Sequence, residues 1–188
     1  MKLRYGALAL IAIVGLPAAG WASDVSPYAG EAGNRIKALD PARVAGLEAG
    51  AGLGYAKAAE LNGYPGPAHL LELADRIPLS PDQVEAIGAI RDAMRADAIG
   101  LGRELIEAEA RLDAAFRERR LDQAGEGRKR LDMLTSAAGG AEARLRARHL
   151  AAHLEAARLL SPEQIAAYAA LRGYAPAGET RGGHGHAH

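Results

Sequence analysis

A six-residue phrase occurs twice in this chain of 188 residues, and each copy marks the start of a helix. It reads Leu-Ser-Pro-Asp-Gln-Val over residues 79–84 and Leu-Ser-Pro-Glu-Gln-Ile over residues 160–165. The serine can cap a free backbone N–H, the proline suits the first helical position, and the glutamine can reach back to close a capping box. We therefore predict a structural role for the motif residues, which are Leu79, Ser80, Gln83, Leu160, Ser161 and Gln164.

A long run of regularly spaced apolar residues follows the first copy. From Val84 to Phe116 an apolar side chain recurs every three or four residues, while the remaining positions carry most of the charged side chains. A repeat of about 3.5 residues is typical of a helix that packs lengthwise against a partner. We predict one helix from Asp82 to about Leu121, roughly 60 Å long at 1.5 Å per residue.

The chain is predicted to turn over residues 119–130, which are strongly charged and include two glycines, and then to run back. A second amphipathic stretch extends from Leu131 to about Leu159, with a bend or a close contact expected at Gly139 and Gly140. Together with a short last helix, these elements predict an all-α fold, a long antiparallel helical hairpin with short flanking helices. The two copies of the phrase should then lie near each other. Because one hairpin leaves apolar surface uncovered, we also expect a symmetric homodimer.

The composition agrees with helix packing and excludes several classes of function. Alanine and leucine supply most apolar side chains, and Phe116 is the only phenylalanine, whereas β-sandwiches are rich in aromatic and β-branched residues. The chain has no cysteine, which excludes disulfides and thiolate metal sites. Acidic and basic residues number 23 each, so no net positive charge is available to attract nucleic acid, and we expect no nucleic-acid partner.

The first residues have the features of a secretory signal peptide. Lys2 and Arg4 precede an apolar run that is too short to span a bilayer comfortably, since a span takes about 20 residues. Small residues over 18–22 then provide a cleavage site after Ala22. We predict that residues 1–22 are removed on export.

Three regions are expected in the exported chain. Residues 23–40 predict a mobile or loosely docked N-terminal arm, residues 41–174 a helical domain, and residues 175–188 a flexible tail rich in glycine and histidine. Glycines at positions 46–54 are spaced like a phosphate-binding loop, but the Gly-Lys-Ser/Thr ending and a preceding β-strand are missing. We interpret this stretch as a close helix approach or a hinge.

No group of residues in the sequence predicts an enzyme. Ser80 and Ser161 have no histidine and acid placed to activate them, and the carboxylates fall on charged helix faces rather than in apolar runs. We therefore expect no catalysis and no required cofactor.

The histidines give the clearest indication of a metal. His149 and His153 are four residues apart on the predicted return helix, so both rings project from one side and could clamp a transition metal. The alternative is a pair of surface or packing histidines. Three alternating histidines in the tail could bind Zn, Cu or Ni or could simply be solvated, and these are His184, His186 and His188.

With its signal peptide, its alanine- and leucine-rich helical body and two Leu-Ser/Thr-x-x-Gln motifs flanking a hairpin, the chain resembles the Spy/CpxP family of periplasmic proteins. It is also similar to their heavy-metal-responsive relatives, the CnrX and ZraP groups. The resemblance covers about Leu70 to Tyr174 and rests on the six motif residues named above. It implies a cradle-shaped homodimer in the periplasm that acts as an ATP-independent chaperone or as a stress or metal sensor.

Two functions are therefore expected. The first is a chaperone that binds non-native periplasmic proteins on a surface of aliphatic and basic side chains. Its candidate contacts are Ile87, Ile90, Met94, Leu101 and Leu105, although a helix-packing stripe would use the same positions. The second is a sensor or buffer of Zn, Cu or Ni that signals to a membrane signalling or efflux partner. A helical envelope adaptor without client activity is a third interpretation.

Overall fold

The computed structural model describes residues 25–174. Two compact units divide at residues 32 and 33, and in the first of them residues 25–32 hold one 3-10 turn, η1 (Ala29–Glu31). The predicted signal peptide at 1–22 and the tail from residue 175 lie outside the described residues. Every helix within residues 25–174 is too short or too polar to cross a membrane.

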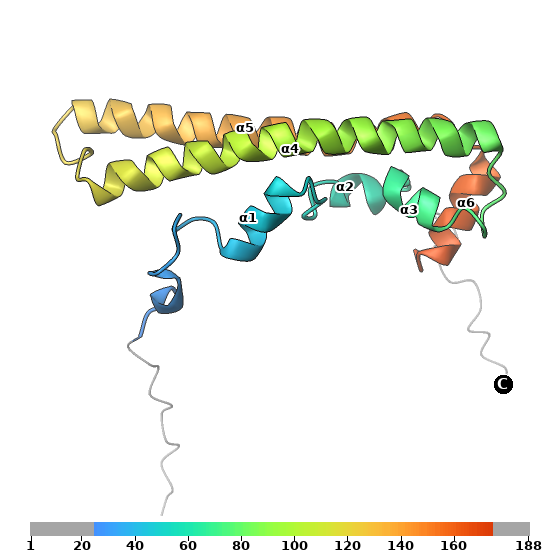
Figure 1. The fold of residues 1–188 in the computed structure, drawn as a ribbon, viewed down its shortest axis with the longest axis horizontal. Coiled ribbons are helices and arrows are strands. Elements are labelled where there is room, and N and C mark those ends of the chain that lie inside the picture. The colour runs from blue at the N-terminus through green and yellow to red at the C-terminus, as the bar shows by residue number, and fades with distance from the viewer. Residues whose placement is uncertain (1–24, 175–188) are drawn as a thin grey trace, which may run out of the picture. The chain divides into compact units, whose positions relative to one another are not determined.

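The second unit is built from helices, which confirms the predicted all-α class (Figure 1). No β-strand occurs within the described residues. The helices are α1 (Pro41–Glu48), α2 (Lys57–Glu60), α3 (Pro67–Glu72), α4 (Pro81–Arg117), α5 (Glu126–Ala157) and α6 (Pro162–Leu171).

The predicted hairpin consists of α4, with 37 residues, and α5, with 32, which pack along each other (Figure 1). Helix α4 ends at Arg117, four residues before the predicted end, because the chain turns at Arg119 with a left-handed φ of 57°. Helix α5 continues without interruption through Gly139 and Gly140. A Cβ at Gly139 would meet nothing within 4 Å, so this glycine is not the close-contact point that we considered.

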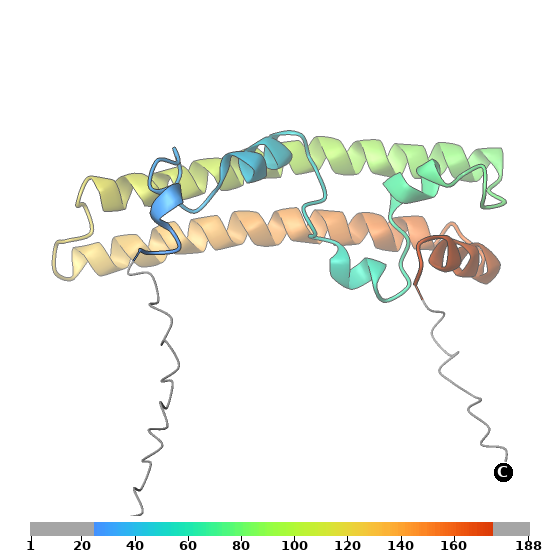
Figure 2. The same ribbon diagram turned by 90° about the horizontal axis from the view of Figure 1, so that it is seen from below.

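One face of the hairpin is covered by residues 33–76, which we call the covering segment. In this segment α1 and α3 contact α4, whereas α2 contacts α5, so the chain crosses between the two long helices (Figure 2). Its own residues Leu47 and Leu70 are buried against the hairpin, and so are Ile36 and Leu39, which are 3% and 5% exposed. The end of the predicted N-terminal arm therefore packs into the core. The covering segment also buries part of the apolar surface for which we expected a second chain.

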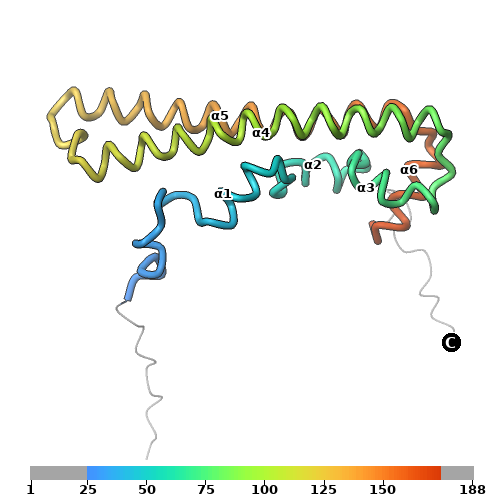
Figure 3. The backbone as a smooth tube through the Cα atoms, in the orientation of Figure 1, coloured from blue at the N-terminus to red at the C-terminus, as the bar shows by residue number. Residues whose placement is uncertain are grey.

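The two copies of the phrase lie together at the open end of the hairpin, where α6 folds back beside the start of α4 (Figure 3). Each copy forms a complete capping box. Ser80 Oγ accepts a hydrogen bond from the Gln83 N–H at 3.1 Å, and Ser161 Oγ accepts one from the Gln164 N–H at 3.3 Å. Each glutamine Oε1 in turn accepts the N–H of its own serine at 2.9 Å.

The two glutamines also bind each other, which the sequence did not predict. Gln83 Nε2 donates to Gln164 Oε1 at 3.0 Å, and Gln164 Nε2 donates to Gln83 Oε1 at 2.9 Å. Each Nε2 also donates to a backbone carbonyl of the other corner, Gln83 to Leu159 at 2.6 Å and Gln164 to Pro78 at 2.7 Å. We call this arrangement the glutamine pair. It joins two helix starts that are 81 residues apart in the chain.

We expect the two glutamines to be energetically coupled. Replacing either one by methionine keeps the side-chain length but leaves a part-buried amide without its partner, so each single change should lower the unfolding free energy by about 1–3 kcal/mol. The double variant should lose less than the sum, with a coupling of about 0.5–3 kcal/mol in a denaturant-unfolding cycle. Additive losses would show that the glutamines act only as separate caps.

A glycine on α4 permits the close approach of α1. An added Cβ at Gly102 would lie 2.6 Å from the backbone oxygen of Leu47, which is closer than such atoms approach in proteins. A Cβ at Gly100 on the same helix would meet nothing within 4 Å, so Gly100 offers a matched control.

We expect Gly102→Ala to lower the unfolding free energy by about 1–3 kcal/mol, because α1 must move away from α4. The change Gly100→Ala should instead raise it by up to about 1 kcal/mol, since alanine favours the helix over glycine. Chemical unfolding of both variants measures the difference. Equal effects at the two positions would contradict the close packing of α1.

Candidate functional site

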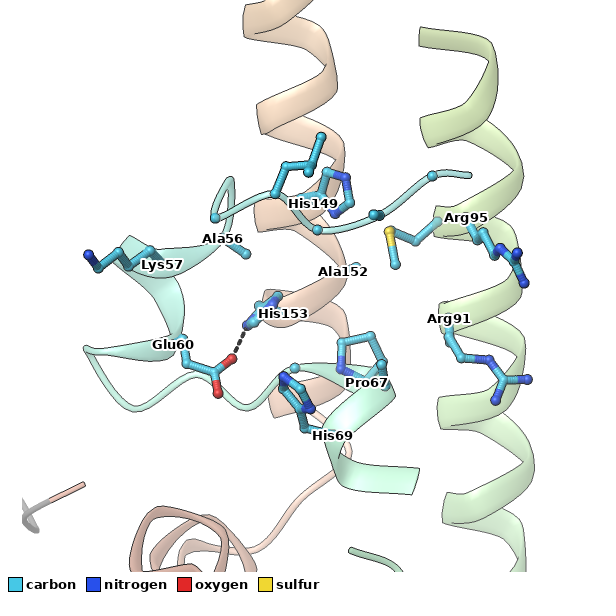
Figure 4. A pocket seen from close by; sticks show the side chains of 18 of the residues that line it. Ala56, Lys57, Glu60, Pro67, His69, Arg91, Arg95, His149, Ala152 and His153 are labelled. Carbon is cyan, nitrogen blue, oxygen red and sulfur yellow. Dashed lines mark ion pairs between the residues drawn. The ribbon is translucent and has the colours of Figure 1, made fainter. Parts of the chain in front are cut away.

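A cavity of about 650 Å³ lies between the covering segment and the two long helices (Figure 4). This volume is in the usual range for ligand pockets. Its wall includes residues 49–54, which connect α1 to the turn before α2 and which we call the glycine loop. The other walls come from α2, from α3 and the turn before it, from α4 and α5, and from the end of the chain described here. The polar and sulfur-containing side chains of the wall are those of Lys57, Glu60, His69, Arg91, Met94, Arg95, His149, His153, Arg172 and Tyr174.

The glycine loop is a close crossing of backbone over α4. Gly50 and Gly54 have φ values of 67° and 76°, which glycine adopts at little cost. A Cβ at Gly50 would lie 2.9 Å from the backbone oxygen of Arg95. The alternative that we preferred from the sequence, a close approach, therefore fits the structure.

His149 projects from α5 and is 4% exposed. Its ring stacks on Tyr55, with centroids 5.7 Å apart and planes at 17°. Its Nε2 is buried and has no hydrogen-bond partner among residues 25–174. Burial lowers the pKa of His149, and the neighbouring His153 and Arg148 lower the pKa further, so the ring is neutral at neutral pH.

His153 lies one helical turn further along α5 and is also buried, at 8% exposure. Its Nδ1 is 2.8 Å from the backbone oxygen of Tyr64. Because a carbonyl oxygen only accepts, Nδ1 must carry the proton, and in the neutral ring Nε2 keeps a lone pair. This is the arrangement by which a backbone carbonyl commonly orients a metal-binding histidine.

Glu60 of α2 connects three parts of the fold beside this pair. Its Oε1 accepts hydrogen bonds from the hydroxyls of Tyr168 at 2.6 Å and Tyr174 at 3.1 Å, and it pairs with Arg172 Nε at 3.4 Å. Its Oε2 lies 3.9 Å from His153 Nδ1 (Figure 4). Burial, and then the hydrogen bond to Glu60, raise the pKa of Tyr168, so its hydroxyl remains a donor. No motif in the sequence indicated this role for Glu60.

The structure thus brings His149 and His153 to one wall of the cavity, as the predicted helical spacing required. His184, His186 and His188 lie outside the described residues. His69 also lines the cavity, and its Nδ1 lies 2.8 Å from Glu72 Oε2 on the same helix. Residues 25–174 contain no cluster of three or more His, Cys, Asp or Glu side chains that could hold a metal. Any metal here would therefore need a donor of another type.

The candidate client contacts separate into two groups. Ile87 and Leu105 are 0% and 2% exposed and belong to the core, so they offer no surface to a client in this structure. The reason is that the apolar stripe of α4 packs against α5 and the covering segment. Ile90, Met94 and Leu101 are half-buried.

Leu101 lines a shallow groove of about 680 Å³ that is formed by α4 and α5 alone. Small side chains make its floor, and two ion pairs cross it, Glu104 with Arg144 at 2.6 Å and Asp97 with Arg148 at 2.7 Å. We call it the open groove, because no residue of the covering segment lines it. Aliphatic and charged groups are therefore adjacent on this surface.

No protein-family model, curated protein or solved structure matches this chain.

The lowered pKa of His149 predicts a pH-dependent stability. The unfolded chain takes up a proton near the ordinary histidine value, about pH 6.5, whereas the folded protein takes it up only at lower pH. This contribution to stability is complete above about pH 6.5 and is lost as the pH falls through that value towards the lower pKa of the folded state. His149→Phe keeps the stack on Tyr55 but cannot titrate, so its unfolding free energy should fall less between about pH 8 and pH 5.

Urea unfolding across this pH range compares wild type, His149→Phe and the control His69→Gln. The control His69→Gln removes a histidine whose side chain is 38% exposed, whereas His149 is buried, so the control should differ less from wild type than His149→Phe does. Identical pH dependence in His149→Phe and wild type would mean that burial of His149 has no energetic effect.

Proposed function

We propose that the protein is a non-enzymatic, ATP-independent chaperone of the Spy/CpxP type, which holds non-native proteins in the periplasm. The observation that carries this proposal is the glutamine pair. Both copies of the motif meet at the open end of a helical hairpin, where their two glutamines bind each other, and this supports the proposal.

The open groove is the surface that best fits a non-native chain. Leu101 supplies an aliphatic contact, Gly100 and Ala147 leave room for a bound segment, and charged side chains flank both. Such a surface makes many weak contacts and can accept different sequences. Leu154 of α5 and Met133 near the hairpin turn add apolar surface, at 44% and 64% exposure. We also propose that two copies of the chain form a homodimer.

We expect the purified protein to suppress aggregation of a chemically denatured client without ATP, as measured by light scattering. Leu101→Glu should weaken this protection several-fold, because it places a charge among the aliphatic contacts. Gly88→Glu introduces the same charged side chain on α4 at a position where an added Cβ would meet nothing within 4 Å, so it serves as the control and should retain protection.

Circular dichroism must show that both variants keep the wild-type fold. No protection by wild type at stoichiometric excess would reject the chaperone proposal, and equal protection by both variants would reject the open groove as its surface. Light scattering coupled to size exclusion tests the homodimer in the same samples.

A second function, metal sensing or buffering, is favoured by one specific observation. The neutral His149 ring and the oriented His153 ring share a cavity wall, and His149 Nε2 has no partner in the part of the chain described. Two imidazoles at this spacing suit Zn, Cu or Ni. A bound metal could pass a signal to a membrane signalling or efflux partner.

Isothermal calorimetry tests this second function. Metal binding should persist when the tail histidines are replaced by glutamine and should disappear in His149→Ala/His153→Ala. Binding that disappears only with the tail histidines would place the metal in the tail, and the cavity would then have no part in it.

A further inference from the structure

A further groove of about 780 Å³ is formed mainly by α2, the turn before it and α5, and we call it the basic groove. It shares Leu53, Lys57 and Leu61 with the cavity wall, but neither His149 nor His153 lines it. The functions proposed above do not use this groove.

Small residues of α5 make part of its lining. Gly139, Glu142, Ala143 and Arg146 line the groove at the three- and four-residue spacing of one helix face. An added Cβ at Gly139 would meet nothing within 4 Å, so packing within the described part of the chain does not require a glycine there. Glycine nevertheless weakens a helix relative to alanine. A backbone without a side chain is what the close approach of a bound segment needs.

Two leucines of the covering segment supply apolar surface to the same groove. Leu61 of α2 is 58% exposed, and Leu53 in the glycine loop is 38% exposed. The lining on α5 runs from residue 139 to residue 146, and these 146 − 139 = 7 residues correspond to about 10 Å, or about two helical turns. A helix bound in a groove places its apolar anchors three or four residues apart, so this length accommodates two anchors.

The charges in the lining are mostly positive. Glu142 is the only carboxylate in the described lining, and its Oε1 already pairs with Arg43 Nη2 at 2.8 Å and accepts the Tyr55 hydroxyl at 3.2 Å. Lys57 and Arg146 are exposed and have no ion-pair partner within the described part of the chain. The Lys57 side chain also points away from the histidines of the cavity (Figure 4). Two uncompensated positive charges favour an acidic occupant and disfavour a basic one.

We propose that the basic groove binds an acidic amphipathic helix of a partner protein. The apolar side chains of that helix contact Leu53 and Leu61, its carboxylates pair with Lys57 and Arg146, and Gly139 admits its backbone. A nucleic acid strand fits less well, because the described lining offers two free cations and no exposed aromatic ring for stacking. The inference does not depend on the functions proposed above, since it uses neither the open groove nor the histidines.

The test is fluorescence anisotropy of a labelled peptide titrated with the full chain. The peptide has about 14 residues, with leucines three and four residues apart on one face, glutamates beside them and alanine elsewhere. We expect saturable binding. Gly139→Leu should weaken it about tenfold or more, because a side chain then occupies the groove. Lys57→Glu/Arg146→Glu should weaken it by a similar factor, because the charges then repel the glutamates.

Each variant has a matched control. Gly140→Leu makes the same change at the next position of α5, which is outside the groove lining. Arg103→Glu/Arg130→Glu reverses the charge of two exposed arginines that are also outside the lining. Both controls should bind the peptide like wild type, and a peptide with lysine in place of each glutamate should not bind to wild type. Circular dichroism checks that every variant keeps the wild-type fold.

Unchanged peptide affinity in Gly139→Leu and in the charge variant, or equal binding of the lysine peptide, would overturn the proposal. Two other occupants would also overturn it. Binding to anionic phospholipid vesicles that is lost in the charge variant, without binding of the acidic peptide, would assign the groove to a lipid surface. Loss of the homodimer in Gly139→Leu, measured by light scattering after size exclusion and without peptide binding by wild type, would assign it to a second copy of this chain.

Discussion

The reciprocal hydrogen bonds between Gln83 and Gln164 are the interaction on which the arrangement of the helices depends most. A glutamine side chain has one oxygen that accepts hydrogen bonds and two amide hydrogens that can be donated. In each glutamine the oxygen accepts from the backbone N–H at its own helix start and from the opposite amide. The amide hydrogens are donated to the opposite glutamine oxygen and to a backbone carbonyl at the opposite corner. The same atoms therefore cap two helices and fix the angle between them. Few other side chains could do both, because a carboxylate cannot donate and a hydroxyl is too short.

The hairpin alone would not form a site, and the covering segment supplies what it lacks. Its glycine loop passes close to α4, and its α2 brings Glu60 to the end of α6. Between these two contacts the segment bridges the long helices and leaves the cavity beneath it. On the opposite side, the open groove remains lined by α4 and α5 alone. The cavity and the open groove thus differ: the cavity is lined by buried histidines and basic side chains, and the groove is shallow and crossed by two ion pairs.

Local chemistry explains what could be predicted from the sequence and what could not. The starts of α4 and α6 were predictable because Ser80 and Ser161 cap the helix within three residues of themselves, and the hairpin followed from the apolar period. The path of the covering segment could not be predicted, because its helices are too short to show a regular spacing of apolar residues. The contact of Glu60 with Tyr168 spans 108 residues and leaves no local signal. The apolar stripe likewise could not show that Ile87 is buried while Leu101 lies at the edge of a groove.

The long sequence separation of these contacts also has a consequence for how the protein folds. The covering segment is synthesised before either long helix, and its partners on α5 and α6 follow about 90 to 110 residues later, as the contacts of Tyr64 with His153 and of Glu60 with Tyr168 illustrate. Closing loops of that length costs entropy that local helical contacts avoid, which slows folding. The hairpin can form from neighbouring turns, whereas the cavity is complete only when the last helix has docked. The covering segment and α6 thus gain their contacts with each other last.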